Sequence, residues 1–419
     1  MIKVLWVCNL ILPRFSEEYG VRKQSFGGWM SGMLAEIEKY SDIDIALCFP
    51  IRNEALLKKG EFQNHKYYSL HTANDVGEYS DSTVNDFIEI LNDYSPDIVH
   101  IWGTEYNHSR VAIEACQRIG VINKVLIDIQ GLVSVYALHY FTGIDVDYLD
   151  CENERGESIR KEQQQFERLG RNEIFDISHV SWVSGRTDWD NICALQINNN
   201  LKYFKCHRIL RQEFYDCKEK WSIENIERHT IFVSQGTYSI KGLHFLIKAI
   251  PYIKKEYSDV KVIVAGVSPL QDDNGIVSPY GKYIKELIAE LGIEDSIEFI
   301  GTITGNEMVN LFLKSHVSVS PSNVENPSNS ICEAMYLGTP IIASYVGGCN
   351  EIIQHGYDGL MYPNDAHYML AGYVCKIFRD DSLAVKLSTN AIVSAKKRHD
   401  KKALGMTMYT NYQTIYKES

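Results

Sequence analysis

The stretch that decides the fold is SPSNVENPSNSICEAMYLGTPIIASYVGGCNEII, which occupies residues 320–353. The apolar run before it is typical of a buried strand, and residues 331–337 are typical of a helix. We therefore expect Glu325 in a strand-to-helix loop and Glu333 near the start of the helix. In open α/β sheets such loops bind ligands, and the unpaired N–H groups of a helix N-terminus favour anions. The stretch predicts a ligand site.

The two glutamates narrow the class of ligand. A carboxylate repels a phosphate group but accepts hydrogen bonds from hydroxyls. A phosphate flanked by hydroxyl-rich groups would suit both the helix N-terminus and the carboxylates. The stretch therefore predicts a nucleotide sugar as the ligand.

Short apolar runs alternate with segments of helical length along the whole chain. Strands are expected at residues 2–8, 44–49, 97–102, 125–129, 180–183, 206–210, 230–234, 260–265, 297–300, 317–320 and 340–343. Helices are expected at about residues 29–40, 82–94, 108–119, 153–175, 241–255, 280–291, 306–314, 331–337, 383–398 and 402–416. This alternation predicts an α/β protein with parallel sheets covered by helices on both faces, in two doubly wound domains.

The residues around the two glutamates carry a resemblance to a known family. Glu325 and Glu333 form Glu-x7-Glu, and Glu333 opens Glu-Ala-Met-x-x-Gly-x-Pro, with Gly-Gly-x-x-Glu downstream. This pattern resembles the signature of the family 4 retaining glycosyltransferases of bacterial polysaccharide biosynthesis. The resemblance implies that Glu325 contacts hydroxyls of the donor sugar and that Glu333 contacts the ribose hydroxyls. It also implies that the backbone amides of Asn329 and Ser330 hold the diphosphate.

The resemblance also implies the GT-B fold, in which two Rossmann-like domains face a cleft and the C-terminal helix crosses back to the first domain. At 419 residues the chain exceeds a single core, and a polar, charged stretch at residues 212–226 marks the boundary. We expect an acceptor-binding domain at residues 1–211, joined by the crossover helix at 399–419, and a nucleotide-sugar domain at 227–398. An α/β chain of another topology is the alternative.

Two further motifs belong to the expected phosphate site. Gly27-Gly28 precede a helix and permit close backbone approach, and the resemblance implies that they meet the diphosphate. Lys241 before Gly242 matches the family's diphosphate lysine, whereas Gln235 stands where the family has arginine. Lysine supplies a charge for the departing β-phosphate, and glutamine supplies only a neutral donor. A hinge loop for the glycines and a solvated lysine are the alternatives.

Gln130 ends an expected strand at a position where the family often has histidine beside the donor sugar. Glutamine does not titrate, so it cannot act as a general base. A front-face reaction, in which the departing phosphate receives the acceptor's proton, needs only positioning and charge stabilisation. We therefore predict Glu325, Lys241 and Gln130 as the catalytic set, with Gln130 bonded to the sugar. A turn-stabilising glutamine is the alternative.

Several other positions stay open at this stage. The resemblance implies that the backbone near Ile303 meets the nucleobase, which leaves no side-chain signature of the base. His100 is expected in the core. Gly103-Thr104-Glu105 and His108 are candidates to face the acceptor, and His108 beside Glu105 is either an acceptor contact or structural. The aromatic segment 133–143 is expected in the core, with a face for a lipid-linked acceptor as the alternative.

The overall composition excludes some classes of partner. A formal net charge of −12 argues against nucleic acid, since phosphate contacts need a basic surface. Ten cysteines without paired spacing predict reduced thiols in a cytoplasmic protein. No signal peptide or membrane-spanning run is expected, so any contact with the inner face of the membrane would be peripheral.

The sequence therefore predicts a retaining glycosyltransferase that uses a nucleoside-diphosphate sugar and a saccharide or lipid-linked acceptor in cell-surface polysaccharide synthesis. No cofactor or metal is expected, because Asp145-Val-Asp147 has a metal-like spacing but lies far from the donor motifs. A nucleotide-sugar epimerase of the same architecture and a non-catalytic sugar-nucleotide-binding partner are the two alternatives. Gln130 and Gln235 motivate the second of these.

Overall fold

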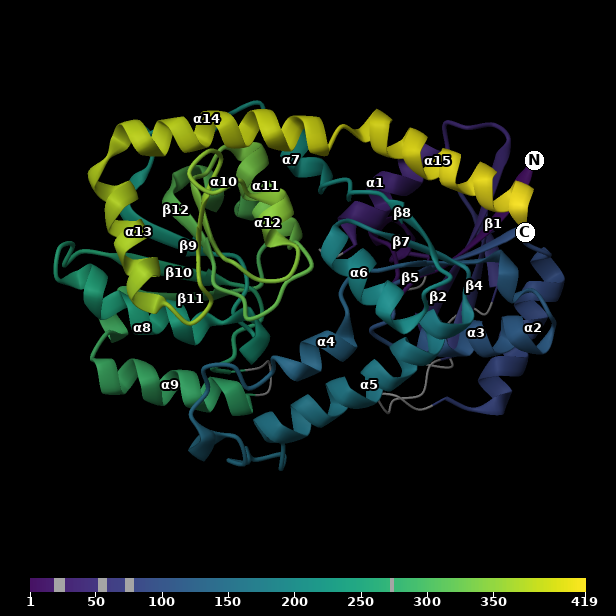
Figure 1. Ribbon diagram of the computed structural model, residues 1–419, viewed down its shortest axis with the longest axis horizontal. Helices are drawn as coiled ribbons and strands as arrows, with labels where there is room; N and C mark the ends of the chain where they lie inside the picture. Colours follow the sequence, from purple (N-terminus) through teal and green to yellow (C-terminus); the bar gives the residue numbers. More distant parts are fainter. Residues whose placement is uncertain (19–26, 52–58, 72–78, 272–274) are drawn as a thin grey trace. The chain divides into compact units, whose positions relative to one another are not determined.

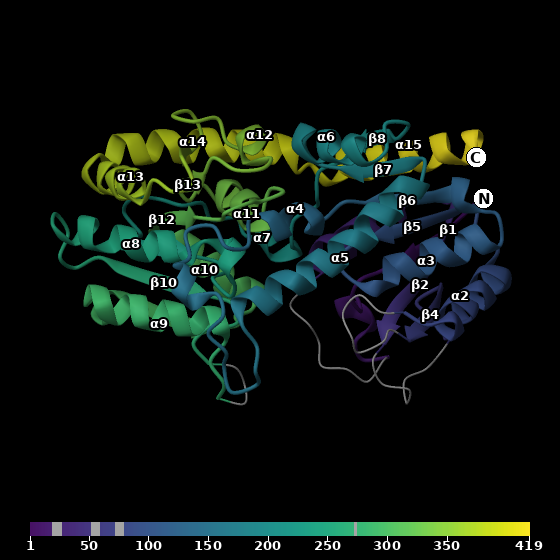
Figure 2. The same cartoon turned by 60° about the horizontal axis from the view of Figure 1, so that its bottom comes forward.

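The computed structural model describes residues 1–18, 27–51, 59–71, 79–271 and 275–419. The chain divides into two compact units (Figures 1 and 2). Unit 1 contains Met1–Ala137, Gln165–Ile209 and His399–Ser419, and unit 2 contains Leu138–Gln164 and Leu210–Arg398.

Unit 1 is built on a sheet of strand order β3-β4-β2-β1-β5-β6-β7-β8. The strands are β1 (Ile2–Val7), β2 (Ile43–Ile51), β3 (Lys59–Phe62), β4 (His65–His71), β5 (Ile98–Trp102), β6 (Val125–Asp128), β7 (Trp182–Gly185) and β8 (Lys202–Lys205). All neighbouring pairs are parallel except β3 and β4. Burial on both faces explains why β1 and β5 are almost entirely apolar, with Lys3 and His100 as the exceptions.

Helices cover both faces of this sheet. They are α1 (Gly28–Ile37), α2 (Asp81–Tyr94), α3 (Asn107–Arg118), α4 (Val133–Leu138), α5 (Ile159–His179), α6 (Asp188–Ile197) and α15 (Lys401–Glu418), with short 3-10 turns η1 (Pro13–Phe15) and η2 (Ile122–Lys124). Helices α2, α3, α5 and α6 share one core with the sheet. Helices α1 and α15 pack together, and Tyr412 of α15 bonds Trp6 and His100 at 2.9 and 2.7 Å.

Unit 2 is built on a sheet of strand order β11-β10-β9-β12-β13-β14, in which all neighbours are parallel. The strands are β9 (Glu227–Val233), β10 (Lys261–Ala265), β11 (Ile297–Gly301), β12 (Ser315–Ser320), β13 (Ile341–Ser344) and β14 (Leu360–Tyr362). The order reverses between β9 and β12. A switch of this kind is where open α/β sheets bind ligands.

The helices of unit 2 form two cores, one on each face of the sheet (Figure 1). They are α7 (Gln212–Asp216), α8 (Leu243–Lys254), α9 (Pro279–Leu291), α10 (Gly305–Lys314), α11 (Asn329–Leu337), α12 (Cys349–Ile352), α13 (His367–Arg379) and α14 (Asp381–Arg398), with the 3-10 turns η3 (Val146–Tyr148), η4 (Ser239–Lys241) and η5 (Glu294–Ser296). Helices α8, α9 and α13 pack on one face, and α7, α10, α11 and α14 on the other.

Residues Leu138–Gln164 belong to unit 2, although they lie within the range expected for the N-terminal domain. Carbonyl oxygens of this segment accept hydrogen bonds from side chains near the start of α8: Ser239 bonds Tyr140 at 2.7 Å, and Lys248 bonds Gly143 at 2.9 Å. These contacts connect residues about a hundred positions apart in the sequence, so no local sequence pattern could predict them. The chain therefore passes between the two units four times.

The α/β architecture with parallel sheets is as predicted from the sequence, and most element positions agree. The strand expected at residues 206–210 is wrong: β8 ends at Lys205, and Arg208 turns inward to pair with Asp128. The polar stretch 212–226 is also not a bare linker, since it contains α7 and buries Phe214 and Trp221. Strands β3, β4 and β14 and helix α13 were not expected.

Candidate active site

The candidate donor site lies at the carboxyl edge of the unit 2 sheet. Strand β9 leads through Gln235 to η4, which ends at Lys241, and the neighbouring strand β12 leads to Glu325. Because parallel neighbours end at the same edge, the two loops meet although their residues are 84 positions apart. The topology thus brings two of the three predicted catalytic residues together.

Two glycines permit the close packing of these loops. Gly242 has φ of +65°, and a Cβ added to it would lie 1.9 Å from the carbonyl oxygen of Pro321. Gly347 has φ of +50°, and its added Cβ would lie 2.1 Å from the carbonyl oxygen of Glu325. A side chain at either position would collide with backbone and adopt a left-handed conformation, which explains why the motifs need glycine there.

Lys241 and Glu325 form an ion pair, with Nζ 2.9 Å from Oε2. The hydroxyl of Ser322 donates to the same carboxylate oxygen at 3.1 Å. Glu325 is only 5% exposed, so this pair is shielded from water. The lysine charge is balanced by the glutamate until an anionic ligand offers an alternative partner.

A small pocket of about 20 Å³ lies beside this pair and is lined by Gln235, Lys241, Ser322, Glu325, Ser328 and Ser330, among others. Its volume is that of about one water molecule. Residues of both loops, Lys241 and Glu325, and Ser330 at the start of α11 therefore line the same pocket.

Helix α11 begins at this pocket. Ser328 is the N-cap, and its hydroxyl accepts a hydrogen bond from the backbone N–H of Ser330 at 3.1 Å. Asn329 and Ser330 are the first two helical residues, so the helix begins two residues before the expected range of 331–337. A phosphate oxygen would compete with the Ser328 hydroxyl for the Ser330 amide, so diphosphate binding there stays a prediction.

Glu333 does not face solvent but forms a bidentate ion pair with Arg211. The Nε and terminal nitrogen of Arg211 lie 2.7 and 2.6 Å from the two oxygens of Glu333. Burial raises the pKa of Glu333, and the Arg211 charge opposes that rise. Each carboxylate oxygen has a second lone pair, so the predicted ribose contact remains chemically open.

Ile303 lies between β11 and α10 at the same carboxyl edge, and it is partly buried against the α10 core. Strand β11 is separated from β9 by β10, which leaves Ile303 two strands away from the Lys241 loop. Gln235 is exposed and lines the pocket beside Lys241. The roles predicted for both residues stay predictions.

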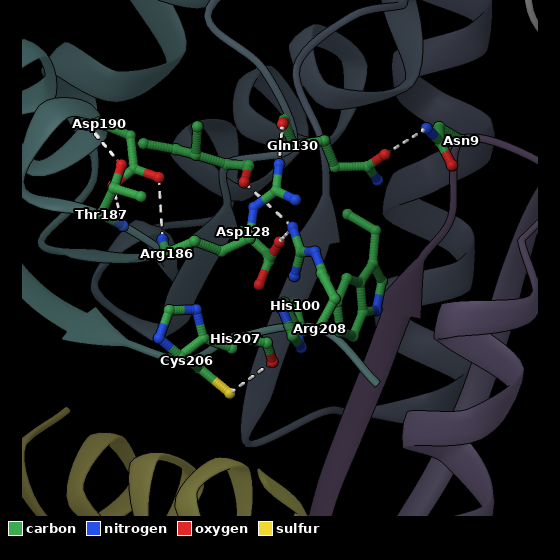
Figure 3. Close-up of polar contacts among 12 residues, drawn as sticks. Asn9, His100, Asp128, Gln130, Arg186, Thr187, Asp190, Cys206, His207 and Arg208 are labelled. Carbon is green, nitrogen blue, oxygen red and sulfur yellow. Dashed lines mark hydrogen bonds and ion pairs between the residues drawn. The ribbon is translucent and has the colours of Figure 1, made fainter. Parts of the chain in front are cut away.

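Gln130, the third predicted catalytic residue, lies in unit 1 at the carboxyl end of β6. Figure 3 shows it between Asn9 and Arg186: Asn9 Nδ2 donates to its Oε1 at 3.3 Å, and Arg186 donates to its backbone carbonyl at 2.6 Å. The backbone and side chain of Gln130 are therefore held from opposite directions. Such contacts orient the amide but do not test the predicted sugar contact.

A buried ion pair between Asp128 and Arg208 supports this loop (Figure 3). Arg208 also donates to the carbonyl of Ile129 at 3.0 Å and lies against the rings of Trp29 and Trp102. Burial raises the pKa of Asp128, and Arg208 opposes the shift. The pair fixes the end of β6 from which Gln130 projects.

Gly27 and Gly28 also lie in unit 1, at the start of α1. Gly27 is the N-cap with φ of +80°, and Leu10 packs where its Cβ would be. The conformation and packing of Gly27 explain the glycine at this position. Contact of this pair with a diphosphate stays a prediction.

The two histidines of the first half are both buried. His100 bonds Tyr412, in agreement with its expected place in the core. The Nε2 atom of His108 lies 3.1 Å from the carbonyl oxygen of Trp102, and burial lowers its pKa to about 4. His108 is thus a structural residue at the start of α3. In segment 133–143, Tyr140 is buried as expected, but Leu138 is exposed.

Sequence reasoning missed Arg211 and Ser322, which contact the two motif glutamates. Arg211 is the last residue of the range expected for the first domain, and no spacing links it to a residue 122 positions away. Asp145 accepts a hydrogen bond from the backbone of Asp147, so it caps η3. Within the described residues, no group of three or more His, Cys, Asp or Glu side chains is placed to hold a metal.

Comparisons with known proteins found a family model, sequence relatives and solved structures that are similar to this chain. Residues 216–394 match the family model of the group 1 glycosyl transferases. An uncharacterized glycosyltransferase of Methanocaldococcus jannaschii is 30% identical over 155 residues, which are 37% of this chain and 37% of that relative. The chain thus aligns with well under half of the length of this relative.

Solved structures are similar over the whole chain. Sucrose-phosphate synthase of Thermosynechococcus elongatus superposes with a TM-score of 0.73 at 16% identity, covering all of both chains. The Anabaena protein HepE, in complex with UDP-glucose, superposes with a TM-score of 0.68 at 16% identity, covering 99% of this chain and 100% of that one. This chain has the GT-B glycosyltransferase fold. The fold class predicted from the sequence is confirmed.

The residues that match the group 1 family model lie in unit 2 of the fold. The matched residues 216–394 coincide with most of unit 2, which holds the Lys241–Glu325 pair and the start of α11. Among the described helices, none is long and apolar enough to cross a membrane. All ten cysteines are free thiols.

Proposed function

We propose that this chain is a retaining glycosyltransferase that moves a hexose from a nucleoside-diphosphate sugar to a hydroxyl of a saccharide or lipid-linked acceptor. The observation that carries the proposal is the shielded Lys241–Glu325 pair beside the N-terminus of α11. One cation, one hydroxyl-accepting carboxylate and a helix N-terminus at one pocket match the three parts of such a donor.

Donor binding would exchange the partners of the ion pair. A β-phosphate oxygen replaces Glu325 beside the Lys241 ammonium, because the phosphate brings more negative charge than the carboxylate. Glu325 is then released to accept hydrogen bonds from sugar hydroxyls, with Ser322 still bonded to it. Glu333, held by Arg211, takes the ribose hydroxyls in the same proposal.

The proposed reaction proceeds on one face of the sugar. The bond between the anomeric carbon and the β-phosphate oxygen breaks, and the acceptor oxygen bonds to the same face of that carbon. The acceptor's proton passes to the departing phosphate, so no titrating side chain is needed at Gln130. Lys241 stabilises the charge that develops on the leaving group, in the role that a metal ion has in other transferases.

The same proposal includes the remaining donor contacts and the biological role of the reaction. Gly27, Gly28, Gln235, Asn329 and Ser330 would complete the diphosphate contacts, and Gln130 would bond the transferred sugar. The nucleobase would meet the backbone near Ile303. We place the reaction in cell-surface polysaccharide synthesis, in the cytoplasm or at the inner face of the membrane, without a metal cofactor.

The test measures binding and turnover separately. HepE is crystallised with UDP-glucose, so UDP and UDP-glucose are the first probes, with GDP and ADP as the other bases. We expect one nucleotide to raise the melting temperature, since a ligand at a hundredfold excess over Kd stabilises by about 2.7 kcal/mol. Slow release of nucleotide from the matching sugar donor should accompany it.

Two variants and a control make the test specific. Lys241→Ala should weaken nucleotide binding at least tenfold, and Glu325→Ala should abolish sugar release while leaving nucleotide binding. Lys386→Ala removes an exposed lysine of α14 in the same unit and should change neither quantity. Equal nucleotide affinity in wild type and Lys241→Ala, or no nucleotide release from any donor, would contradict the proposal.

A further inference from the structure

Unit 1 contains a pocket at the amino edge of its sheet, where β2 and β4 begin. The pocket has a volume of about 400 Å³, which is in the range of small-molecule sites. Its charged or titratable lining residues, among those that the structure describes, are Arg14, Glu38, Asp44 and His65. The proposed donor site is lined by residues of unit 2, so the two pockets are separate.

Three of these side chains form one ion cluster, called the Glu38 cluster below. The terminal nitrogen of Arg14 lies 2.5 Å from Glu38 Oε1, and Nε2 of His65 lies 2.6 Å from the same oxygen. Arg14 belongs to η1, Glu38 follows the last residue of α1, and His65 opens β4. One carboxylate therefore bridges two side chains from different elements.

Both ring nitrogens of His65 face oxygens that only accept hydrogen bonds. Nδ1 lies 2.9 Å from the carbonyl oxygen of Ile45, and Nε2 faces Glu38. Burial opposes ionisation of Glu38, but the hydrogen bonds from His65 and Arg14 outweigh it and lower the pKa of Glu38 to about 2. Because neither oxygen can donate, both ring nitrogens carry a proton, and His65 is an imidazolium.

The Glu38 cluster therefore has two positive charges and one negative charge. Asp44 does not neutralise this excess, because its carboxylate lies on the other face of the sheet. Side chains alternate along a strand, and Ala46 and Cys48, two and four positions after Asp44, pack in the core that contains α2. Burial and the Asp44 carboxylate also raise the pKa of Tyr94, which lies on α2.

Arg14 has donors left for a ligand. A guanidinium carries five N–H groups, and within the described part of the chain Glu38 is the one side chain to which Arg14 donates. The side chain of Arg14 is 25% exposed, so part of the guanidinium reaches the pocket. Oxyanions fit a guanidinium through two parallel hydrogen bonds. The exposed amides of Gln63 and Asn64, in the turn between β3 and β4, line the same pocket.

We propose that this pocket binds a small organic oxyanion, a phosphate ester or a carboxylate, whose charged group contacts Arg14 beside the Glu38 cluster. The excess positive charge attracts the anion, and Gln63 and Asn64 bond its polar body. A bare phosphate ion would leave most of a volume of about 400 Å³ unfilled, so the ligand has an organic part. The site does not depend on the glycosyltransferase function proposed above.

The test is isothermal titration calorimetry on the full chain at about pH 6, in the Lys241→Ala background, so that the donor site cannot account for anion binding. The probes are glucose 6-phosphate as the phosphate ester and glucuronate as the carboxylate. Glucose is the neutral comparison, and inorganic phosphate is the bare anion. We expect at least one of the two organic anions to bind more tightly than both comparisons, and the better of the two identifies the charged group.

Three variants separate charge from structure. Arg14→Gln should weaken binding by about tenfold or more, because a hydrogen bond to a charged group is lost. Arg14→Lys keeps the charge without the fork and should give a smaller loss. Glu38→Gln removes the competing carboxylate, so it should bind the anion at least as tightly as the unchanged cluster. Melting temperatures establish that each variant folds.

Arg118→Gln is the matched control, because it removes another guanidinium of unit 1 that pairs with carboxylates and is 35% exposed. It should leave anion binding unchanged. Equal affinity for glucose and both organic anions, unchanged affinity in Arg14→Gln, or equal losses in Arg14→Gln and Glu38→Gln would overturn the inference. Nitrogen-15 NMR gives an independent check: a neutral His65 ring at about pH 6 would also overturn it, because the cluster would then have no excess charge.

Discussion

Replacing Arg211 by alanine should destabilise the protein more than any loss of a surface ion pair. Glu333 has a side chain 2% exposed, and the side chain of Arg211 is 18% exposed. Arg211→Ala removes both hydrogen bonds from a buried carboxylate and leaves its charge without a partner. Removing one partner of a buried pair in this way costs about 3–5 kcal/mol in the free energy of unfolding.

The chain offers a matched control in the same unit. Arg228 and Asp381 also form a bidentate pair, at 2.5 and 2.8 Å, but their side chains are 47% and 49% exposed. Arg228→Ala should therefore cost about 1 kcal/mol or less. Urea unfolding measured by circular dichroism and tryptophan fluorescence compares the two variants. Equal losses of stability would refute the reasoning, because burial would then make no difference.

The same variant tests the link between Arg211 and the ligand. If the guanidinium positions Glu333 for ribose hydroxyls, Arg211→Ala should reduce the preference for UDP over 2′-deoxy-UDP, in addition to any general loss of affinity. The double variant Arg211→Met/Glu333→Leu, which leaves no buried charge, should recover much of the stability but none of this preference. Recovery of the preference in the double variant would assign it to other residues.

Two further predictions follow from backbone geometry and from burial. Gly347→Ala should lose about 1–2 kcal/mol for a left-handed alanine and also weaken nucleotide binding, since its Cβ would lie 2.1 Å from the Glu325 carbonyl oxygen. Gly356→Ala has the same kind of backbone (φ of +77°) with nothing within 4 Å, so it should lose stability alone; nucleotide loss in both variants would contradict the collision. Burial and the neighbouring carboxylates raise the pKa of Glu105 from 4.5 to about 7, so the native state retains a proton that the unfolded state releases between these pH values. Wild type should therefore lose stability relative to Glu105→Gln by up to about 3 kcal/mol between pH 4.5 and 8 in urea titrations, and a pH-independent difference would show that the carboxyl titrates normally.

The sequence predicted most of the strands and helices in both halves because apolar runs and helical segments are local patterns, but it missed β3, β4, β14 and α13. Residues whose roles depend on distant partners were not accessible in this way. Arg211 directly precedes the polar stretch 212–226, and its pairing with Glu333 depends on where α7 and α11 meet. Residues 103–105 and His108 were interpreted as candidates to face the acceptor, whereas the structure buries His108 and, among the described residues, leaves a Glu105 oxygen without a hydrogen-bond partner.

The sequence by itself determined the α/β class and the loop that carries Glu325 between β12 and α11, because Glu325, the serines and the downstream glycines form one continuous pattern. Only the tertiary structure decided that Lys241 and Glu325 neutralise each other, and that Arg211 occupies both oxygens of Glu333. It also decided that Leu138–Gln164 packs with unit 2. The physical reason is that hydrogen bonds and ion pairs depend on distances of about 3 Å, which parallel strand pairing sets between residues far apart in the chain.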